Sequence, residues 1–187
     1  MPEQGQTGYT GTAEIEWESA VYPSAASSKK LWSLMPREER GLAAKHFFDP
    51  ATGVNPVFRN AAIAAIAKSR NSREVSIRKA TREQQENWLA GNQMIIEEIA
   101  DTLIRVYLLH EQLPMIEAFL DDLKVPHTKG LIEDSFDCSA LSTEDLTAAA
   151  RRLSEAHGVE AVELYLVYTA GSTGDWADAV KRIPLPL

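Results

Sequence analysis

The sequence predicts an all-α protein, an irregular helix bundle around one long central helix at about residues 84–112. Apolar residues recur at helical spacing through most of the chain after residue 29, and capping signatures precede several of these segments. Only the segments 13–21 and 160–169 have strand-like composition, and the second is assigned to a helix here. An α+β fold with a minor sheet from these two segments is the alternative.

Length and composition are those of one ordinary globular domain. The chain has 187 residues, of which 44% are hydrophobic and 25% are charged, which is sufficient for a sizeable core. We expect a flexible arm at 1–28, rich in Gly, Ser, Thr and Glu, and a single helical domain at 29–187. In the arm, Ile15, Trp17 and Val21 alternate with acids, so this segment is predicted either to dock on the body through Trp17 or to add to a partner.

Turn and capping signals divide the first part of the domain into short helices. Pro36 is suited to open one of them, because its fixed φ fits the start of a helix. The cluster of Asp, Pro, Gly and Asn at 49–56 is typical of a turn. A further helix is expected to begin near Pro56, and Ser72 is expected to cap the short basic helix that follows.

The segment 84–112 has the widest apolar band. Thr81 and Gln84 have the spacing of a capping box, and beyond them apolar residues recur at helical intervals as far as His110. Two apolar stripes lie beside each other, which predicts contact with other helices on two sides. At about 1.5 Å per residue such a helix would be roughly 40 Å long.

Helix signals continue in the C-terminal part of the chain. Pro114 opens the next helix, Ser142 and Asp145 have capping-box spacing, and Gly158 closes that later helix. The intervening connection at 125–141 is longer than the ~4–6 residues typical of compact domains. It is therefore either functional or packed down by its own apolar residues.

The sequence contains no motif that assembles a catalytic, nucleotide or metal site. Both glycine-rich phosphate-binding motifs and the G-x-S-x-G elbow are missing, and the four histidines have no paired-ligand spacing. Cys138 lies among acids, which raise the pKa of a thiol and make it a poor nucleophile. We therefore predict neither a metal ion nor a cofactor.

Two histidines are weak candidates for catalysis. His110 continues the apolar seam of the central helix beside Glu111, and His127 follows in the long connection with Asp134 and Asp137 nearby in sequence. An imidazole beside an acid can act as a general acid or base, whereas a histidine at a helix end commonly satisfies carbonyls. A small hydrolase-like enzyme that uses either histidine is a minor alternative.

Basic residues are concentrated in residues 59–82, which we call the basic strip. The whole chain has a formal charge of −8, but the strip holds seven Lys or Arg against the single acid Glu74, so the remaining residues carry −14. We predict charge that is solvated or paired with acids at 121–137 across the fold or across a dimer. A nucleic-acid site is disfavoured, because no aromatic residue interleaves the cations and the turn within the strip lacks glycine. The residues expected to meet a partner are Arg70, Arg73, Arg78, Lys79 and Arg82, together with Trp17.

The leading functional hypothesis is a non-catalytic protein-binding or scaffold module, whose ligand is a protein partner or a second copy of the chain. Nucleic-acid binding by the basic strip is the second hypothesis. No apolar run reaches the ~20 residues of a membrane span, and the N-terminus lacks the basic and apolar regions of a secretory signal. We therefore expect a cytoplasmic protein without membrane contact, in agreement with its single cysteine.

Overall fold

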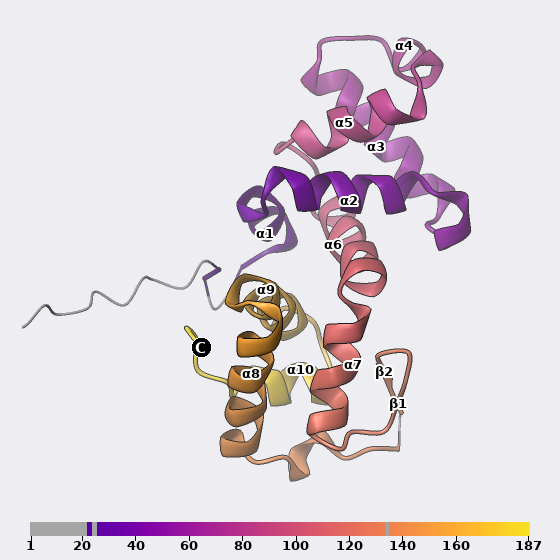
Figure 1. Cartoon of the computed structure of the whole chain (residues 1–187). Helices are drawn as coiled ribbons and strands as arrows, with labels where there is room; N and C mark the ends of the chain where they lie inside the picture. The colour runs from indigo at the N-terminus through magenta and orange to yellow at the C-terminus, as the bar shows by residue number, and fades with distance from the viewer. Residues whose placement is uncertain (1–21, 24–25, 134) are drawn as a thin grey trace, which may run out of the picture.

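The computed structural model describes residues 22–23, 26–133 and 135–187. Within them the chain forms ten α-helices and one two-stranded hairpin, so the all-α class is confirmed (Figure 1). The α-helices are α1 (Ser28–Leu34), α2 (Arg37–Phe48), α3 (Pro56–Ser69), α4 (Glu74–Lys79), α5 (Arg82–Gly91), α6 (Glu97–Glu111), α7 (Leu113–Asp122), α8 (Thr143–His157), α9 (Val159–Ala170) and α10 (Asp175–Val180). The other elements are the 3-10 turns η1 (Pro50–Thr52) and η2 (Cys138–Ala140) and the strands β1 (His127–Thr128) and β2 (Leu131–Ile132).

The helices form two groups stacked along α6 (Figure 1). In the upper group α2 lies across α5 and α6, with α3 and α4 beyond it and α1 beside α6. In the lower group α8 packs between α7 and α9, and α10 packs on α9. One continuous cluster of buried apolar side chains runs through both groups. None of the described helices is both long and apolar enough to cross a bilayer.

The single helix predicted at 84–112 is broken into α5 and α6, so its predicted length was wrong. Its start is confirmed, because Thr81 and Gln84 form the capping box of α5. The helix ends at Gly91, a poor helix former. Asn92 is extended, its side-chain oxygen accepts a hydrogen bond from the Met94 N–H at 2.9 Å, and its carbonyl accepts one from the indole of Trp32 at 2.9 Å. These bonds hold Asn92 outside the helical conformation and turn the chain before α6.

The alternative fold with a strand at 160–169 is wrong, because these residues lie inside α9. The helix α9 is buried along most of its circumference. Its nearly continuous apolar sequence is therefore that of a buried helix and not that of a strand. The other strand-like segment, 13–21, lies outside the described residues. The start of the short basic helix α4 also differs from the prediction, because Ser72 does not cap this helix. The Ser72 hydroxyl instead donates a hydrogen bond to the Arg70 carbonyl at 3.2 Å.

The long connection at 125–141 folds into the hairpin β1–β2 and the turn η2. Thr128 pairs with Leu131, and the two residues between them, Lys129 and Gly130, both have positive φ, of 50° and 74°. This is the geometry of a type I′ turn, which matches the twist of the strands. The hairpin lies against α7, because a Cβ atom built on Gly130 would come within 3.2 Å of the Ile116 side chain.

Gly130→Ala is expected to lower the free energy of unfolding by about 1–2 kcal/mol, because alanine disfavours the left-handed conformation. The added methyl group would also press on α7. Gly53 is a matched control, because it has a similar φ of 68° but open space around its Cβ position. Urea unfolding should therefore show a larger loss for Gly130→Ala than for Gly53→Ala. Equal losses would contradict close packing between the hairpin and α7.

Candidate functional site

The basic strip does not form one continuous free surface. Arg59 on α3 donates hydrogen bonds to the carbonyls of Phe47 and Asp49, at 3.1 and 2.7 Å, and so satisfies the C-terminal end of α2. Arg82 lies 2.7 Å from the carboxylate of Glu86 and 4.0 Å from that of Asp49. Both guanidinium groups are therefore engaged locally.

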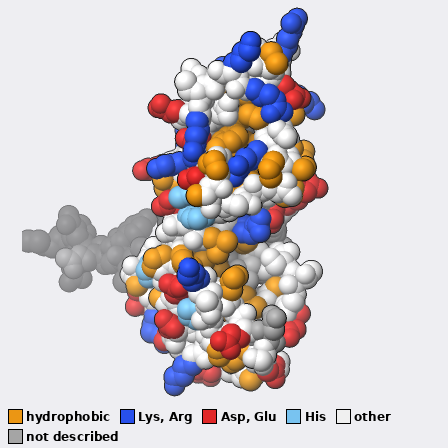
Figure 2. All heavy atoms as spheres, turned by 90° about the vertical axis from the view of Figure 1, so that its right-hand side faces the viewer, with side chains coloured by type: hydrophobic (Ala, Val, Ile, Leu, Met, Phe, Trp, Pro, Cys, Tyr) orange, Lys and Arg blue, Asp and Glu red, His pale blue; other side chains and the backbone are white. Residues whose placement is uncertain are grey.

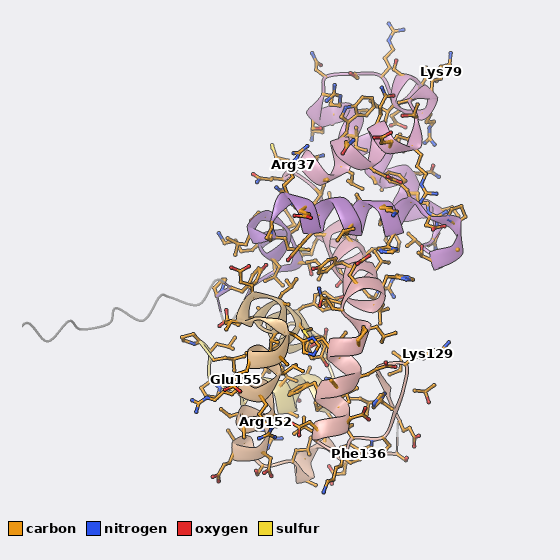
Figure 3. All side chains as sticks on the ribbon, in the orientation of Figure 1. Arg37, Lys79, Lys129, Phe136, Arg152 and Glu155 are labelled. Carbon is orange, nitrogen blue, oxygen red and sulfur yellow. The ribbon has the colours of Figure 1, made fainter. Side chains whose placement is uncertain are left out.

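The remaining cations of the basic strip differ in their surroundings. Arg78 donates to the Asn60 side chain at 2.9 Å and lies 3.6 Å from the Glu74 carboxylate. Arg73 and Lys79 are exposed and make no ion pair with the described residues, and Lys79 lies at the outer end of the molecule (Figure 3). Arg70 lies over the Trp88 ring, 4.3 Å from its centroid.

The described acids at 121–137 do not face the basic strip within the fold, so the predicted pairing across the fold is wrong, whereas solvated charge and pairing across a dimer stay predictions. Asp122 on α7 pairs with Arg152 on α8 at 2.8 Å. Asp121 lies 3.2 Å from the imidazole of His127. The far end of α7 and the helix α4 lie at opposite ends of the molecule (Figure 1).

His110 is exposed on α6 and does not continue the apolar seam, which corrects the prediction. Its ring stacks on that of His46 from α2, with a centroid distance of 4.6 Å and an interplanar angle of 13°. His46 in turn hydrogen-bonds the carboxylate of Glu111. The contacts among these three side chains connect α2 to the end of α6. None of the three lines the apolar groove or the second pocket, which are both described below.

His127 has a structural role in the hairpin. Its Nε2 lies 3.2 Å from Asp121, and its Nδ1 accepts a hydrogen bond from the Gly130 N–H at 3.4 Å. The acid beside it is therefore Asp121 rather than Asp137, whose carboxylate accepts from the Ser139 N–H. Asp134 lies outside the described residues. Within the described part of the chain, neither histidine is hydrogen-bonded to a Ser, Thr or Cys side chain.

Cys138 is buried in η2, and burial raises the pKa of its thiol, with a smaller contribution from Asp175 and Asp137. The thiol is therefore held in its unreactive protonated form. Among the described residues, no three His, Cys, Asp or Glu side chains converge as they would around a metal ion.

An apolar groove of about 320 Å³ lies where α6, α7, the hairpin, α9 and α10 meet. Hydrophobic side chains are exposed on the face of the molecule that carries the hairpin (Figure 2). Two leucines beside the groove are unusually accessible, Leu131 at 68% and Leu109 at 38%. The groove is lined by Arg105, Leu108, Leu109, Ile116, Gly130, Leu131, Ile132, Tyr165, Tyr168, Thr169 and Trp176.

Aromatic side chains form one wall of the groove and are fixed by hydrogen bonds. The Trp176 indole donates to the hydroxyl of Tyr165 at 3.2 Å, and the hydroxyl of Tyr168 donates to Asp101 at 3.0 Å. Phe119 supports them from below, with its ring 6.1 Å from Tyr165 and 5.9 Å from Trp176. Burial raises the pKa of Tyr165 to about 12, so this wall is uncharged at neutral pH.

Arg105 is the single charged side chain among the described residues that line the groove. It is exposed and makes no ion pair with any described residue. Asp101, one turn earlier on α6, is engaged by the Tyr168 hydroxyl, and Glu97 is engaged by the first backbone N–H groups of α1. The groove therefore presents apolar walls and one cation without a partner.

The sequence indicated only part of this groove, through the length of the connection at 125–141. Its other residues come from four helices, and each looks like an ordinary core or surface residue in its own segment. No family model, no curated protein and no solved structure matches the chain. The fold and the groove together describe an α-helical protein. Its apolar surface groove lies beside an arginine that makes no ion pair with the described residues.

Proposed function

We propose that this protein is a non-catalytic binding module whose apolar groove takes up a segment of a partner protein, in which apolar side chains stand beside an acid. The observation that carries the proposal is the groove itself, apolar and aromatic except for the unpaired Arg105. Accessible apolar surface of this kind is typical of interaction sites. A carboxylate on the partner would supply the charge that Arg105 lacks and would fix the orientation of the bound segment.

The dimensions of the groove favour a peptide segment. A volume of about 320 Å³ accommodates a few side chains rather than a folded surface. The walls come from four helices and a type I′ hairpin, which are regular elements, so little ordering of the protein itself is needed on binding. Leu131, at 68% exposure, would lose the most water contact when the groove fills.

Nucleic-acid binding by the basic strip and a hydrolase-like activity have less support. Arg59, Arg78 and Arg82 are engaged by local acceptors, which leaves fewer cations free for phosphates. His110 and His127 are engaged by His46 and Asp121 and lie outside the groove.

A peptide library in which apolar positions alternate with acids tests the proposal. Peptides selected on the wild-type protein are expected to lose about tenfold or more in affinity for Leu131→Glu, because the substitution places a charge in an apolar contact. Val75→Glu is the matched control, because Val75 is 59% exposed on α4, far from the groove. Equal binding to the wild-type protein and to Leu131→Glu would contradict the proposal.

A charge exchange tests the role of Arg105. Arg105→Glu is expected to weaken the selected peptides, and replacement of the critical peptide acid by lysine should restore their binding to Arg105→Glu. Light scattering of the free protein separates the two kinds of partner. A concentration-dependent dimer that Leu131→Glu dissociates would show that a second copy fills the groove and would overturn a peptide partner.

A further inference from the structure

We infer that a second pocket, formed by the start of α2, the end of α3 and the end of α5, binds a small molecule that carries a phosphate monoester. The pocket has a volume of about 430 Å³ and lies in the upper group of helices, away from the apolar groove. None of the described carboxylates lines it, although the whole chain has a formal charge of −8. Its charged side chains are Arg37 and Arg70.

The last turn of α5 forms the centre of the pocket. One side of this helix carries Asn87, Trp88 and Gly91. Gly91 follows Trp88 by three residues and Asn87 by four, a spacing that places residues on the same face of a helix. Arg70, at the end of α3, lies over the Trp88 ring at 4.3 Å. This contact positions the guanidinium group but does not neutralise its charge.

Arg37 approaches the same turn from the start of α2 (Figure 3). A Cβ atom at Gly91 would lie 2.9 Å from the Nη1 atom of Arg37, so this close approach depends on the missing side chain at position 91. Arg37 makes no ion pair with any described residue, and neither does Arg70. Two guanidinium groups thus flank one turn of helix without an anionic partner.

A third arginine, Arg40, lies near Arg37 on α2. Arg40, one turn along α2 from Arg37, is only 7% exposed, and its Nε and Nη1 atoms have no hydrogen-bond partner among the described residues. Its guanidinium lies 5.8 Å from the ring of Trp32, whose indole is bonded to the carbonyl of Asn92, a residue that lines the pocket. A buried cation without an acceptor is costly, and Arg37 adds like-charge repulsion.

The C-terminus of α5 does not compensate this positive charge. A helix end carries roughly half a negative charge, whereas Arg37, Arg40 and Arg70 together carry three positive charges. A dianion would offset most of the positive charge that remains. The oxygens of a phosphate monoester also match the forked geometry of guanidinium groups. The volume exceeds that of phosphate alone, and the Asn87 and Gln93 amides offer hydrogen bonds to a polar organic body.

The test is thermal unfolding and calorimetric titration of the full chain with inorganic phosphate and with panels of sugar and nucleoside monophosphates. At least one monophosphate is expected to raise the Tm, because a ligand that binds only the folded state stabilises it. The corresponding sugar or nucleoside without phosphate should not. Arg37→Gln and Arg70→Gln are each expected to weaken binding by about tenfold or more, because each removes a charge-assisted hydrogen bond. Lys68→Gln, which removes an exposed cation from the same helix α3, is the matched control and should bind as the wild type does.

Two further variants separate binding from folding. Gly91→Ala improves helix propensity but displaces Arg37, so it should preserve the Tm of the free protein and weaken binding. Arg40→Met removes the unpartnered buried cation, so its free Tm should equal or exceed that of the wild type while the stabilisation by the monophosphate decreases.

Three results would overturn the inference. The first is that no monophosphate raises the Tm or releases heat at millimolar concentration. The second is that Lys68→Gln weakens binding as much as Arg37→Gln, which would indicate nonspecific attraction. The third is that single-stranded oligonucleotides bind more tightly than monophosphates, with an affinity that grows with length, which would indicate a nucleic-acid surface.

Discussion

Replacing Trp32 by alanine is expected to lower the free energy of unfolding by about 3–5 kcal/mol, the loss typical of a large core aromatic. The Trp32 side chain has no exposed surface. Its indole donates a 2.9 Å hydrogen bond to the carbonyl of Asn92, so the substitution also leaves a buried acceptor without its partner. The helix α1 would lose its anchor to α6 and to the linker between α5 and α6.

Trp32→Phe separates the two contributions. Phenylalanine retains most of the buried apolar surface but cannot donate to Asn92, so a smaller loss of about 1–2 kcal/mol is expected. Urea unfolding monitored by circular dichroism measures both variants on the same scale. A loss below about 1 kcal/mol for Trp32→Ala would contradict the central position of Trp32 in the core.

The elements that the sequence predicted well depend on local interactions. The capping pairs Thr81–Gln84 and Ser142–Asp145 both form at the predicted residues, because each involves atoms only three residues apart. The break after Gly91 was missed, because the apolar stripes continue across it. It is stabilised by the bond from Trp32, which is 60 residues away in sequence and therefore invisible to a local pattern.

The candidate sites could be predicted only in part for the same reason. The basic strip is a cluster in sequence, but the fold directs Arg59 and Arg82 to local acceptors and separates them from Arg70. Arg70 was predicted to meet a partner, whereas Arg37 was not singled out, because nothing near it in sequence is unusual. Only the packing of α2 against α5 brings these two arginines to one pocket.

A second large loss of stability is expected at alkaline pH, because four tyrosines are buried or half-buried in the described part of the chain. Tyr22, Tyr107 and Tyr165 are each at most 6% exposed. Burial raises the pKa of Tyr107 and of Tyr165 to about 12, from an ordinary value of 10.0. Burial raises the pKa of Tyr22 and the pKa of Tyr168 as well. Each hydroxyl therefore stays protonated in the folded protein at pH values where the unfolded chain has lost that proton.

The direction of the effect follows from these pKa values. Below pH 10 the tyrosines are neutral in both states, so their contribution to stability is fully present; it decreases as the pH rises from about 10 towards about 12. Each group contributes a loss of up to about 1.4 kcal/mol per pH unit, so the four groups give about 5 kcal/mol per unit. A typical domain is stable by about 5–15 kcal/mol, so unfolding is expected within one to three pH units above pH 10.

Urea unfolding at a series of pH values, together with the absorbance of the phenolate, measures this loss directly. The variant Tyr165→Phe should reduce the slope of stability against pH by about a quarter, because one of the four groups is removed. It should also cost some stability at neutral pH, since Trp176 would lose the acceptor of its indole N–H. A phenolate absorbance increase around pH 10 that is smaller in Tyr165→Phe than in the folded wild-type protein would contradict the burial of the Tyr165 hydroxyl; the comparison cancels the contribution of Tyr9, which lies outside the described residues. The same comparison would then place the Tyr165 hydroxyl at the surface, and the core around α9 would have to be packed differently.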